Sequence, residues 1–348
     1  MKSQTMTSMA IVALTALAAC AGTVCAWQDP GLDPRVAATI GPQIPVPHSC
    51  DTWEAPPGIA SAPGLWQGGI VPFEIEGSVA DPALSRTAMD VWMFRSNAPN
   101  VTFIRRDPAN PAHNNYIRIR GVAGSVSSSY IGVCSGCGTS DSGQIVTQGQ
   151  QVNVYVMAHE YCHALGFDHE QCRPDRDNYV DVWYSRVYPQ TSQHNFNIRP
   201  GSDWPANALS TGYDFDSTMH YGATSFMNPS CDLGLGTCLS VLTCTPLVAR
   251  ADLGYGVYQC TMGQQSFLSN NDVQDMVNVY GARPRPVHFV GPTNQASGTL
   301  SNPYSSTSQI PGSGDVWIEG GQSYSGSGRI YTAPATWNKH GSGVAIIQ

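Results

Sequence analysis

Hydrophobic and polar residues alternate in several short segments of the first half of the chain. In IVPFEIEG, which begins at Ile70, the side chains of Phe73 and Ile75 alternate with other positions as in a half-buried strand. The segments VTFIRR (101–106) and NYIRIRG (115–121) have the composition of strands as well. We therefore expect a strand in each of these three segments.

Elsewhere the apolar positions follow the period of a helix. Asp81-Pro82 is a favourable helix start, with a capping side chain followed by proline at the first helical position. The apolar positions that continue this helix are Leu84, Ala88, Val91 and Trp92. A second helix is expected from about Gln151 to Leu165, ended by Gly166 because glycine tolerates the left-handed conformation common just past a helix.

A third helix is indicated near the end of the regular part of the chain. Ser269 is followed three residues later by Asp272, which is the spacing of a capping pair. The expected core face of this helix consists of Val273, Met276, Val277 and Tyr280.

Two segments lack the strand and helix periods of apolar residues. Residues 27–64 are rich in proline and have few periodic apolar positions, so an extended and poorly packed segment is expected. Residues 284–348 are rich in Gly, Ser and Thr, and a domain boundary is placed before them. This tail resembles a turn of a right-handed parallel β-helix, with a plain Gly/Ser-rich extension as the alternative.

The first 26 residues have the features of an export signal. Lys2 is followed by the apolar run 11–19 and by Val24-Cys25-Ala26, a small-residue cleavage site. The run is too short to span a bilayer, and no other segment is apolar enough to do so. The alternative is a lipid anchor, because residues 17–20 form a lipobox ending in Cys20. We interpret the chain as secreted and extracellular.

The charge composition of the chain limits the kinds of molecule that it is expected to bind. Charged residues make up 12% of the chain, the net charge is −8, and there is no run of Lys or Arg. Nucleic acid is therefore excluded as an expected partner, because its recognition depends on basic patches.

Cysteine usage agrees with export. Of eleven cysteines, eight lie at positions 134, 137, 162, 172, 231, 238, 244 and 260, and disulfides are the default state for them in an exported chain. Cys134 and Cys137 form a CxxC in which a structural bond is expected and redox activity is the alternative. Cys162 is a candidate partner of Cys172. Cys50 stands apart near the N-terminus.

Residues 159–170, HEYCHALGFDHE, concentrate histidine and glutamate. On one helix, His159 and His163 lie one turn apart and project from the same face. Gly166 lets the chain bend back, so that His169 approaches from another direction. Three neutral imidazoles suit Zn²⁺ and leave a fourth position open to water, which is the arrangement of a catalytic site.

Glu160 supplies a proton carrier beside this group. Bound zinc lowers the pKa of water to ~7, and Glu160 can take the proton and later give it to a leaving amine. From the composition of the chain, the pattern HExxHxxGxxH would arise by chance on the order of once in 10⁵ such chains. The spacing therefore indicates a metal site with chemistry.

These motifs resemble those of the astacins, a branch of the metzincin zinc endopeptidases. The resemblance runs through HExxHxxGFxHE from His159 and RxDRD from Arg173, and STMHY from Ser217 is similar to the family's Met-turn. Weaker matches extend it over about residues 63–281. It implies one zinc ion per chain, held by His159, His163 and His169, with Glu160 as general base and acid.

The resemblance implies further roles. Met219 would form an apolar floor beneath the metal. Tyr221 would bind zinc in the resting enzyme and then hydrogen-bond the oxyanion of the intermediate, since a donor aimed at developing charge lowers a barrier. Glu170 would receive the mature N-terminus after cleavage near residues 56–62, which makes residues 27–60 a propeptide.

Latency is a separate hypothesis about that propeptide. Cys50 can supply a thiolate, which is a strong zinc ligand, and Asp51 can supply a carboxylate. Either side chain would then occupy the open coordination position. The alternative is that Cys50 pairs with one of the other cysteines.

The fold that the resemblance implies is α+β. An astacin-like catalytic domain (61–283) would have a twisted N-terminal sheet with two long helices, a less regular C-terminal subdomain and zinc in the cleft between them. The expected function is a secreted zinc endopeptidase acting on proteins or peptides. Two alternatives are a zinc-binding recognition protein without turnover, against which the intact Glu160 argues, and a zinc hydrolase of non-protein amides.

Overall fold

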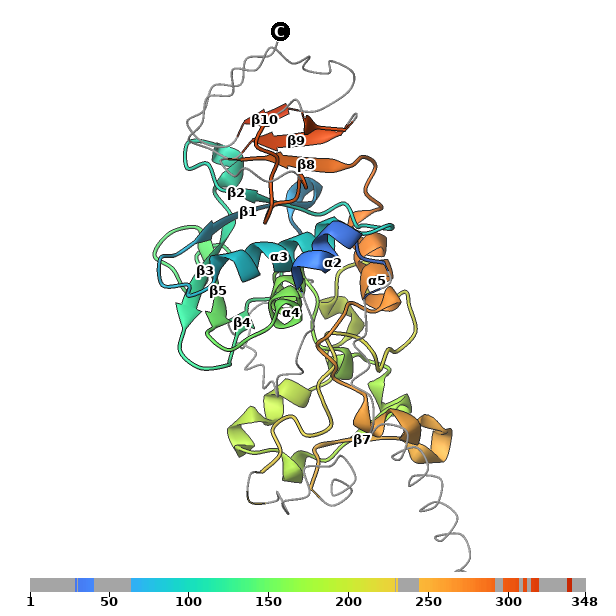
Figure 1. Ribbon diagram of the computed structural model, residues 1–348. Coiled ribbons are helices and arrows are strands. Elements are labelled where there is room, and N and C mark those ends of the chain that lie inside the picture. The colour runs from blue at the N-terminus through green and yellow to red at the C-terminus, as the bar shows by residue number, and fades with distance from the viewer. Residues whose placement is uncertain are drawn as a thin grey trace, which may run out of the picture.

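The computed structural model describes residues 29, 31–40, 64–228, 230, 244–291, 297–306, 309–311, 314–318 and 337–339 (Figure 1). The predictions for the signal segment 1–26, for Cys50 and Asp51 and for a cut near residues 56–62 lie outside this part of the chain. Within it, no helix is long and apolar enough to cross a membrane.

A five-stranded sheet forms one layer of the fold, in the order β2-β1-β3-β5-β4. Its strands are β1 (Ile70–Ile75), β2 (Thr102–Arg105), β3 (Tyr116–Val122), β4 (Ser128–Ser129) and β5 (Gly143–Gly149). All neighbours pair in parallel except the edge strand β4, which runs antiparallel to β5. The three expected strands are confirmed, while β4 and β5 were not predicted.

The alternation expected in β1 is not observed. Val71, Pro72 and Phe73 are buried in succession, because β1 is an interior strand of a parallel sheet, whose strands are covered on both faces.

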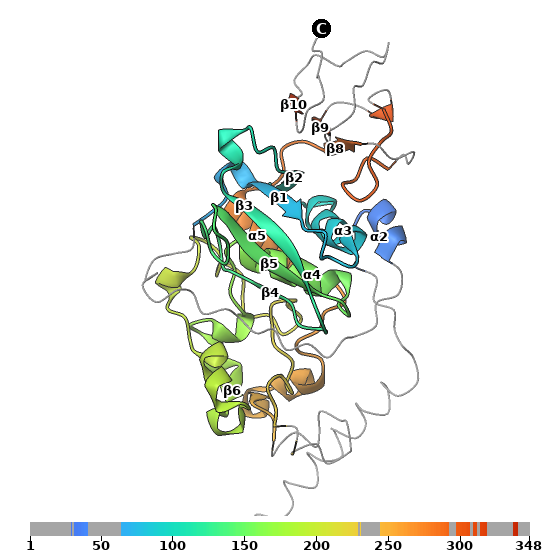
Figure 2. The same cartoon turned by 90° about the vertical axis from the view of Figure 1, so that its left-hand side faces the viewer.

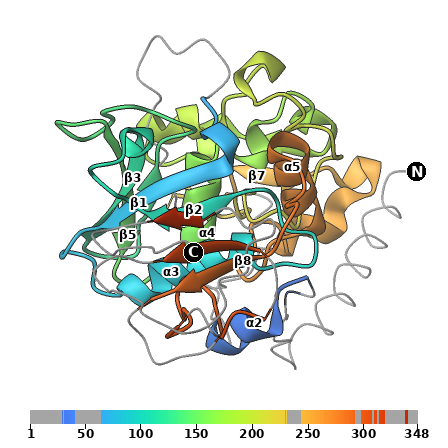
Figure 3. The ribbon, with the colours of Figure 1, turned by 90° about the horizontal axis from the view of Figure 1, so that it is seen from above.

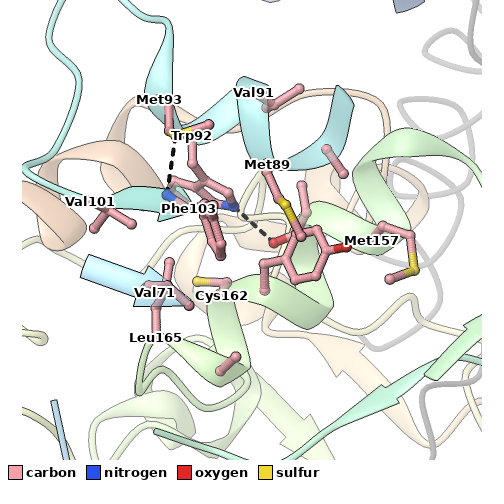
Figure 4. Close-up of a cluster of buried hydrophobic side chains, with 14 of the residues drawn as sticks. Val71, Met89, Val91, Trp92, Met93, Val101, Phe103, Met157, Cys162 and Leu165 are labelled. Carbon is pink, nitrogen blue, oxygen red and sulfur yellow. Dashed lines mark hydrogen bonds between the residues drawn. The ribbon is translucent and has the colours of Figure 1, made fainter. Parts of the chain in front are cut away.

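Helices α3 (Pro82–Met93) and α4 (Val154–Ala164) pack together beside the sheet. Asp81 caps α3 as expected, because its carboxylate accepts the backbone N–H groups of Ala83 and Leu84 at 3.0 Å. The indole of Trp92 on α3 donates to the carbonyl oxygen of Ala158 on α4 at 3.0 Å. Figure 4 shows side chains of both helices meeting those of β1 and β2 in one buried cluster.

Helix α5 (Asn270–Tyr280) begins with the predicted capping box between Ser269 and Asp272. Val273 and Met276 are fully buried in the main core, and Val277 packs against it. The phenol of Tyr280 donates to the carbonyl oxygen of Leu165 at 2.8 Å, which fixes α5 against the end of α4.

The chain between α4 and α5 is less regular, as expected. It contains the antiparallel pair β6 (Val180–Val182) and β7 (Leu247–Ala249). Among its described residues, the short 3₁₀ helices are Glu170–Cys172, Arg176–Asn178, Tyr184–Arg186, Gln190–Phe196, Gly201–Asp203, Ala251–Leu253 and Tyr255–Cys260. This part has an aromatic-rich core of its own and lies on the opposite side of α4 from α3 (Figures 1 and 2).

The expectation of a poorly packed segment before residue 64 is wrong for residues 31–40. Helix α2 (Pro34–Ile40) lies beside α3 (Figures 1 and 3), and Leu32 and Val36 are buried in the main core. The signal was missed because α2 is only seven residues long and is stabilised by contacts with distant parts of the chain.

The tail forms a small parallel sheet in the order β10-β9-β8, from β8 (Val287–Val290), β9 (Asp315–Ile318) and β10 (Trp337–Lys339). Parallel strands of this kind fit the β-rich tail that was expected rather than a plain extension. Phe289 and Trp317 belong to the main core, and the ring of Phe289 lies 6.4 Å from that of Phe94 at the end of α3. The tail therefore shares its core with the preceding domain.

The cysteines differ in part from expectation. Cys134 and Cys137 are bonded to each other, and Cys244 and Cys260 are also in disulfides. The suggested bond between Cys162 and Cys172 is wrong, because both are free, buried thiols. Cys162 lies in the main core, whereas the Cys172 thiol donates to the carbonyl oxygen of Asn195 at 3.3 Å.

Candidate metal centre

Helix α4 positions the first two histidines of the candidate site. Its N-cap is Asn153, whose side-chain oxygen accepts the N–H of Val156 at 2.9 Å. Every residue of the helix is buried, including His159 and His163 one turn apart. The helix ends at Ala164, close to where the sequence predicted.

Gly166 turns the chain back toward the helix. Its φ of 108° is unfavourable for residues with a side chain, and its N–H donates to the carbonyl oxygen of His163 at 2.8 Å. This turn brings His169 to the two histidines of α4. The sequence predicted that bend from the glycine alone.

The three imidazoles converge. One ring nitrogen from each of His159, His163 and His169 lies within 4.8 Å of the others, and the Nε2 atoms of His163 and His169 are 3.2 Å apart. All three side chains are buried. The structure therefore brings together the three residues that the sequence proposed as ligands.

Backbone carbonyls fix the orientation of two rings. Nδ1 of His159 lies 2.7 Å from the carbonyl oxygen of Thr218, and Nδ1 of His163 lies 2.7 Å from that of Phe167. A carbonyl can only accept, so each Nδ1 carries the hydrogen and each Nε2 keeps its lone pair. Imidazoles held in this way are the usual ligands of zinc, and the donor set fits that ion.

The third ring is held by a carboxylate. Nδ1 of His169 is 3.4 Å from Oδ1 of Asp168, whose other oxygen accepts Nε of Arg199 at 3.0 Å. Burial opposes ionisation of Asp168, yet the hydrogen bond and charge of His169 and the charge of Arg199 outweigh it and lower its pKa to about 2. Burial and the neighbouring His163 lower the pKa of His169 to about 4, which favours the neutral, ligating form.

Asp168, His169 and Cys172 form a second group with ligand atoms within 4.8 Å of one another. Asp168 is already paired with Arg199, and the Cys172 thiol donates to a backbone carbonyl. Burial also raises the pKa of Cys172 well above its ordinary value, which disfavours the thiolate that binds metals. The three histidines are therefore the better metal site.

Glu160 and Tyr221 lie at this centre. Glu160 is fully buried in α4 directly after His159, and its charge acts on His169. The ring of Tyr221 lies 4.2 Å from that of His169, and it also packs against Phe196 and Phe226.

The turn that carries Tyr221 is joined to the segment after the third histidine. The N–H of Glu170 donates to the carbonyl oxygen of Met219 at 3.0 Å, and the N–H of Tyr221 donates to the side-chain oxygen of Gln171 at 2.9 Å. Met219 is buried in the main core, whereas Tyr221 belongs to the aromatic core. The turn therefore connects the two halves of the fold beside the histidines.

The carboxylate of Glu170 is buried beside this turn. It accepts the N–H of Asp214 at 2.8 Å and lies 3.5 Å from Nη1 of Arg173. Burial raises its pKa well above the ordinary value, and Arg173 offsets this only in part. The expected pairing with a mature N-terminus involves residues outside the described part of the chain.

A residue of α5 supports the turn that carries Tyr221, and the sequence did not predict this role. The carboxylate of Asp272 accepts the hydroxyl of Ser217 at 2.5 Å and the N–H of Thr218 at 2.9 Å, in addition to the N–H of Ser269 at 2.9 Å. Asp272 therefore holds Thr218 from its N–H side, and the carbonyl oxygen of the same residue orients His159. The capping-pair signal identified Asp272, but only as the start of a helix.

Comparison with known proteins places the chain among peptidases. The model of the peptidase family Astacin matches residues 59–281. The bone morphogenetic protein 1 homolog of Strongylocentrotus purpuratus is 31% identical over 212 residues, which cover 60% of this chain and 29% of that protein. Human tolloid-like protein 1 is 29% identical over 251 residues, 69% of this chain and 20% of that protein.

Meprin A subunit beta of Mus musculus is 40% identical over 107 residues, 28% of this chain and 15% of that protein. This chain thus spans less than a third of the length of these relatives. Among solved structures, high choriolytic enzyme 1, a hatching enzyme zinc-protease from Oryzias latipes, aligns with a TM-score of 0.47 and 23% identity. That alignment covers 64% of this chain and 95% of that one.

Proposed function

This chain belongs to the astacin family of zinc metalloendopeptidases, and we propose that it hydrolyses internal peptide bonds of protein substrates at the centre formed by His159, His163 and His169. The observation that carries the proposal is the convergence of three buried imidazoles, two of them with Nδ1 held by a backbone carbonyl. Their Nε2 atoms would hold the metal. When bound, zinc supplies Lewis-acid chemistry and lowers the pKa of water to about 7.

Glu160 moves the proton in this proposal. It is fixed in α4 next to His159 and shielded from bulk water, so its carboxylate can accept a proton from the attacking water and return it to the leaving amine. A protein that only bound zinc would have no use for a base at this position.

Tyr221 stabilises the oxyanion and is a resting-state ligand in the same proposal. Its ring packs against that of His169, which keeps Tyr221 beside the third imidazole. A phenol donor aimed at developing negative charge contributes more in the transition state than in the ground state. Met219 and Gly166 act structurally, as the buried floor residue and the turn that brings in His169.

We also propose secretion and activation by cleavage. The sequence of residues 1–26 and the disulfides at Cys134–Cys137, Cys244 and Cys260 support an oxidising destination. Cleavage near residues 56–62 would free an ammonium group for the buried carboxylate of Glu170, whose raised pKa marks a site that gains from a positive partner. Cys50 or Asp51 would maintain latency before that cut.

The direct test is digestion of casein by processed protein, with and without a metal chelator. Proteolysis that disappears with the chelator and returns with zinc supports the proposal. The matched control is Glu160→Gln, which keeps the shape of the side chain and removes its basicity. We expect the variant to bind zinc and to lose activity by at least about 10²-fold, the scale of general acid–base catalysis. Undiminished activity in this variant would exclude the assigned role.

A further inference from the structure

The N-terminal segment is attached to the catalytic domain by a buried ion pair. The carboxylate of Asp29 accepts hydrogen bonds from both terminal nitrogens of Arg95 at 2.5 and 2.7 Å, and each side chain is only 1% exposed. Oδ2 of Asp29 also accepts the N–H of Leu268, just before α5, at 3.3 Å. Removal of Asp29 would leave the Arg95 guanidinium charged and buried, which is strongly unfavourable.

Backbone contacts extend this attachment. The N–H of Ser96 donates to the carbonyl oxygen of Gly31 at 3.1 Å, and the N–H of Asp33 donates to that of Phe94 at 2.9 Å. Leu32, between these two bonds, forms a β-bridge with Arg95 and is buried in the main core together with Val36. The segment thus combines a desolvated charge pair, main-chain pairing and apolar anchors.

The tail of the chain also contacts the N-terminal segment and α3. Nη1 of Arg35 donates to the carbonyl oxygen of Ser297 at 2.8 Å. The buried carboxylate of Asp90 on α3 accepts the N–H groups of Leu300 and Ser301 at 2.9 and 2.8 Å. Helix α2 therefore lies against both α3 and the tail (Figures 1 and 3).

The contacts of the N-terminal segment bury a charge pair and join the main core. They involve α3, the start of α5 and the tail rather than any of the three histidines. Residues 41–63 connect this segment to the catalytic domain, and the proposed maturation cut falls within that connection. Hydrolysis there would remove the covalent link without removing any residue that makes these contacts.

We propose that Asp29 and residues 31–40 form a permanent strap, which remains bound to the catalytic domain after the connection at 41–63 is cut. The binding surface is formed by Arg95, the backbone of Phe94 and Ser96, Leu268 and the tail. Its occupant is this chain's own N-terminal segment. The proposal rests on the proposed function only in that it takes maturation to occur by a cut in this connection.

The test uses the full chain carrying Glu160→Gln and Cys50→Ser, so that its outcome depends neither on catalysis nor on a bond through Cys50. A site for a sequence-specific protease is inserted between Glu54 and Ala55, and the purified protein is cut there. We expect denaturing mass spectrometry to show two fragments and native mass spectrometry to show one complex at sub-micromolar concentration. Release of the N-terminal fragment under native conditions would overturn the proposal.

Two variants test the assigned contact. Asp29→Asn should weaken retention of the strap at least about tenfold, because it removes the charge that neutralises Arg95. The matched control is Asp252→Asn, which removes the same charge from an exposed pair with Arg250 outside the strap and should leave retention unchanged within about twofold. Equal retention by both variants would exclude the ion pair as the anchor. The cut protein that carries neither variant tests whether the strap is retained at all.

Discussion

The imidazole of His159 donates its Nδ1 hydrogen to the backbone carbonyl of Thr218 at 2.7 Å, so a residue of α4 is oriented by a turn 59 positions later. Asp272 at the start of α5 holds that turn in place. The geometry of the candidate metal centre therefore depends on three separate parts of the sequence.

Asp272→Asn should weaken zinc binding roughly tenfold, because the amide cannot accept all of the donors that now converge on the carboxylate, and the Thr218 carbonyl loses its fixed position. Zinc affinity is measured by competition with a chelator of known affinity, and unfolding is followed in parallel. Asp275→Asn on the same helix is the control, since Asp275 accepts from Thr211 and not from the turn. An equal loss of affinity in both variants would show that α5, rather than the turn contact, is responsible.

Asp90 should make the protein less stable as pH rises. Burial raises its pKa to about 7, against hydrogen bonds from Ser301 and Leu300 and the charge of Arg86, which lower it. Because the folded state then holds a proton that the unfolded state releases near pH ~4, the unfolding free energy falls between about pH 4 and pH 7. The contribution is at most about 1.4 kcal/mol per pH unit.

The measurement is urea unfolding across that pH range for the parent chain and for Asp90→Asn. The variant should show a shallower fall, because its amide does not titrate. The difference between the two proteins isolates Asp90 from Asp272, whose pKa burial also raises to about 7. Parallel pH profiles would contradict the assignment.

The tail should contribute to the stability of the catalytic domain. Phe289→Ala removes a buried ring that packs near Phe94, and we expect a loss of about 3–5 kcal/mol in the free energy of unfolding. Zinc affinity should not change. Val257→Ala, at an exposed position, is the control and should cost less than about 0.5 kcal/mol. A tail that folds separately would leave the main unfolding transition unmoved by Phe289→Ala.

Cys162 and Cys172 should be alkylated without reductant, and only after unfolding. Both thiols are free and buried, so the folded chain protects them although no bond joins them. Peptide mapping after iodoacetamide treatment distinguishes the states. Recovery of a disulfide-linked pair of peptides containing both residues would contradict this prediction and show that the bond suggested by the sequence is present.

Elements could be predicted from the sequence where residues a few positions apart contact each other. Asp81 and the Ser269–Asp272 pair cap α3 and α5 through bonds between residues two or three positions apart, so they could be predicted directly. The histidine motif was similarly local, because a helical turn and Gly166 are enough to bring the three rings together.

The missed features depend on distant partners. Strand β5 contains Gln144 and Gln148, which are buried but hydrogen-bonded, so its polar residues conceal an interior strand. Helix α2 is fixed through Asp29 and Arg95, which lie 66 positions apart. The roles of the Thr218 carbonyl and Asp272 likewise exist only in the folded chain. No local pattern reports such contacts.

The central claim is tested most directly by zinc stoichiometry and zinc-edge X-ray absorption on the purified, processed protein. We predict one zinc per chain, with nitrogen or oxygen ligands at about 2.0–2.1 Å and no sulfur shell near ~2.3 Å, as three imidazoles require. His163→Ala should lose the metal. A protein without stoichiometric metal, or a sulfur ligand that places the ion with Asp168, His169 and Cys172, would contradict the account.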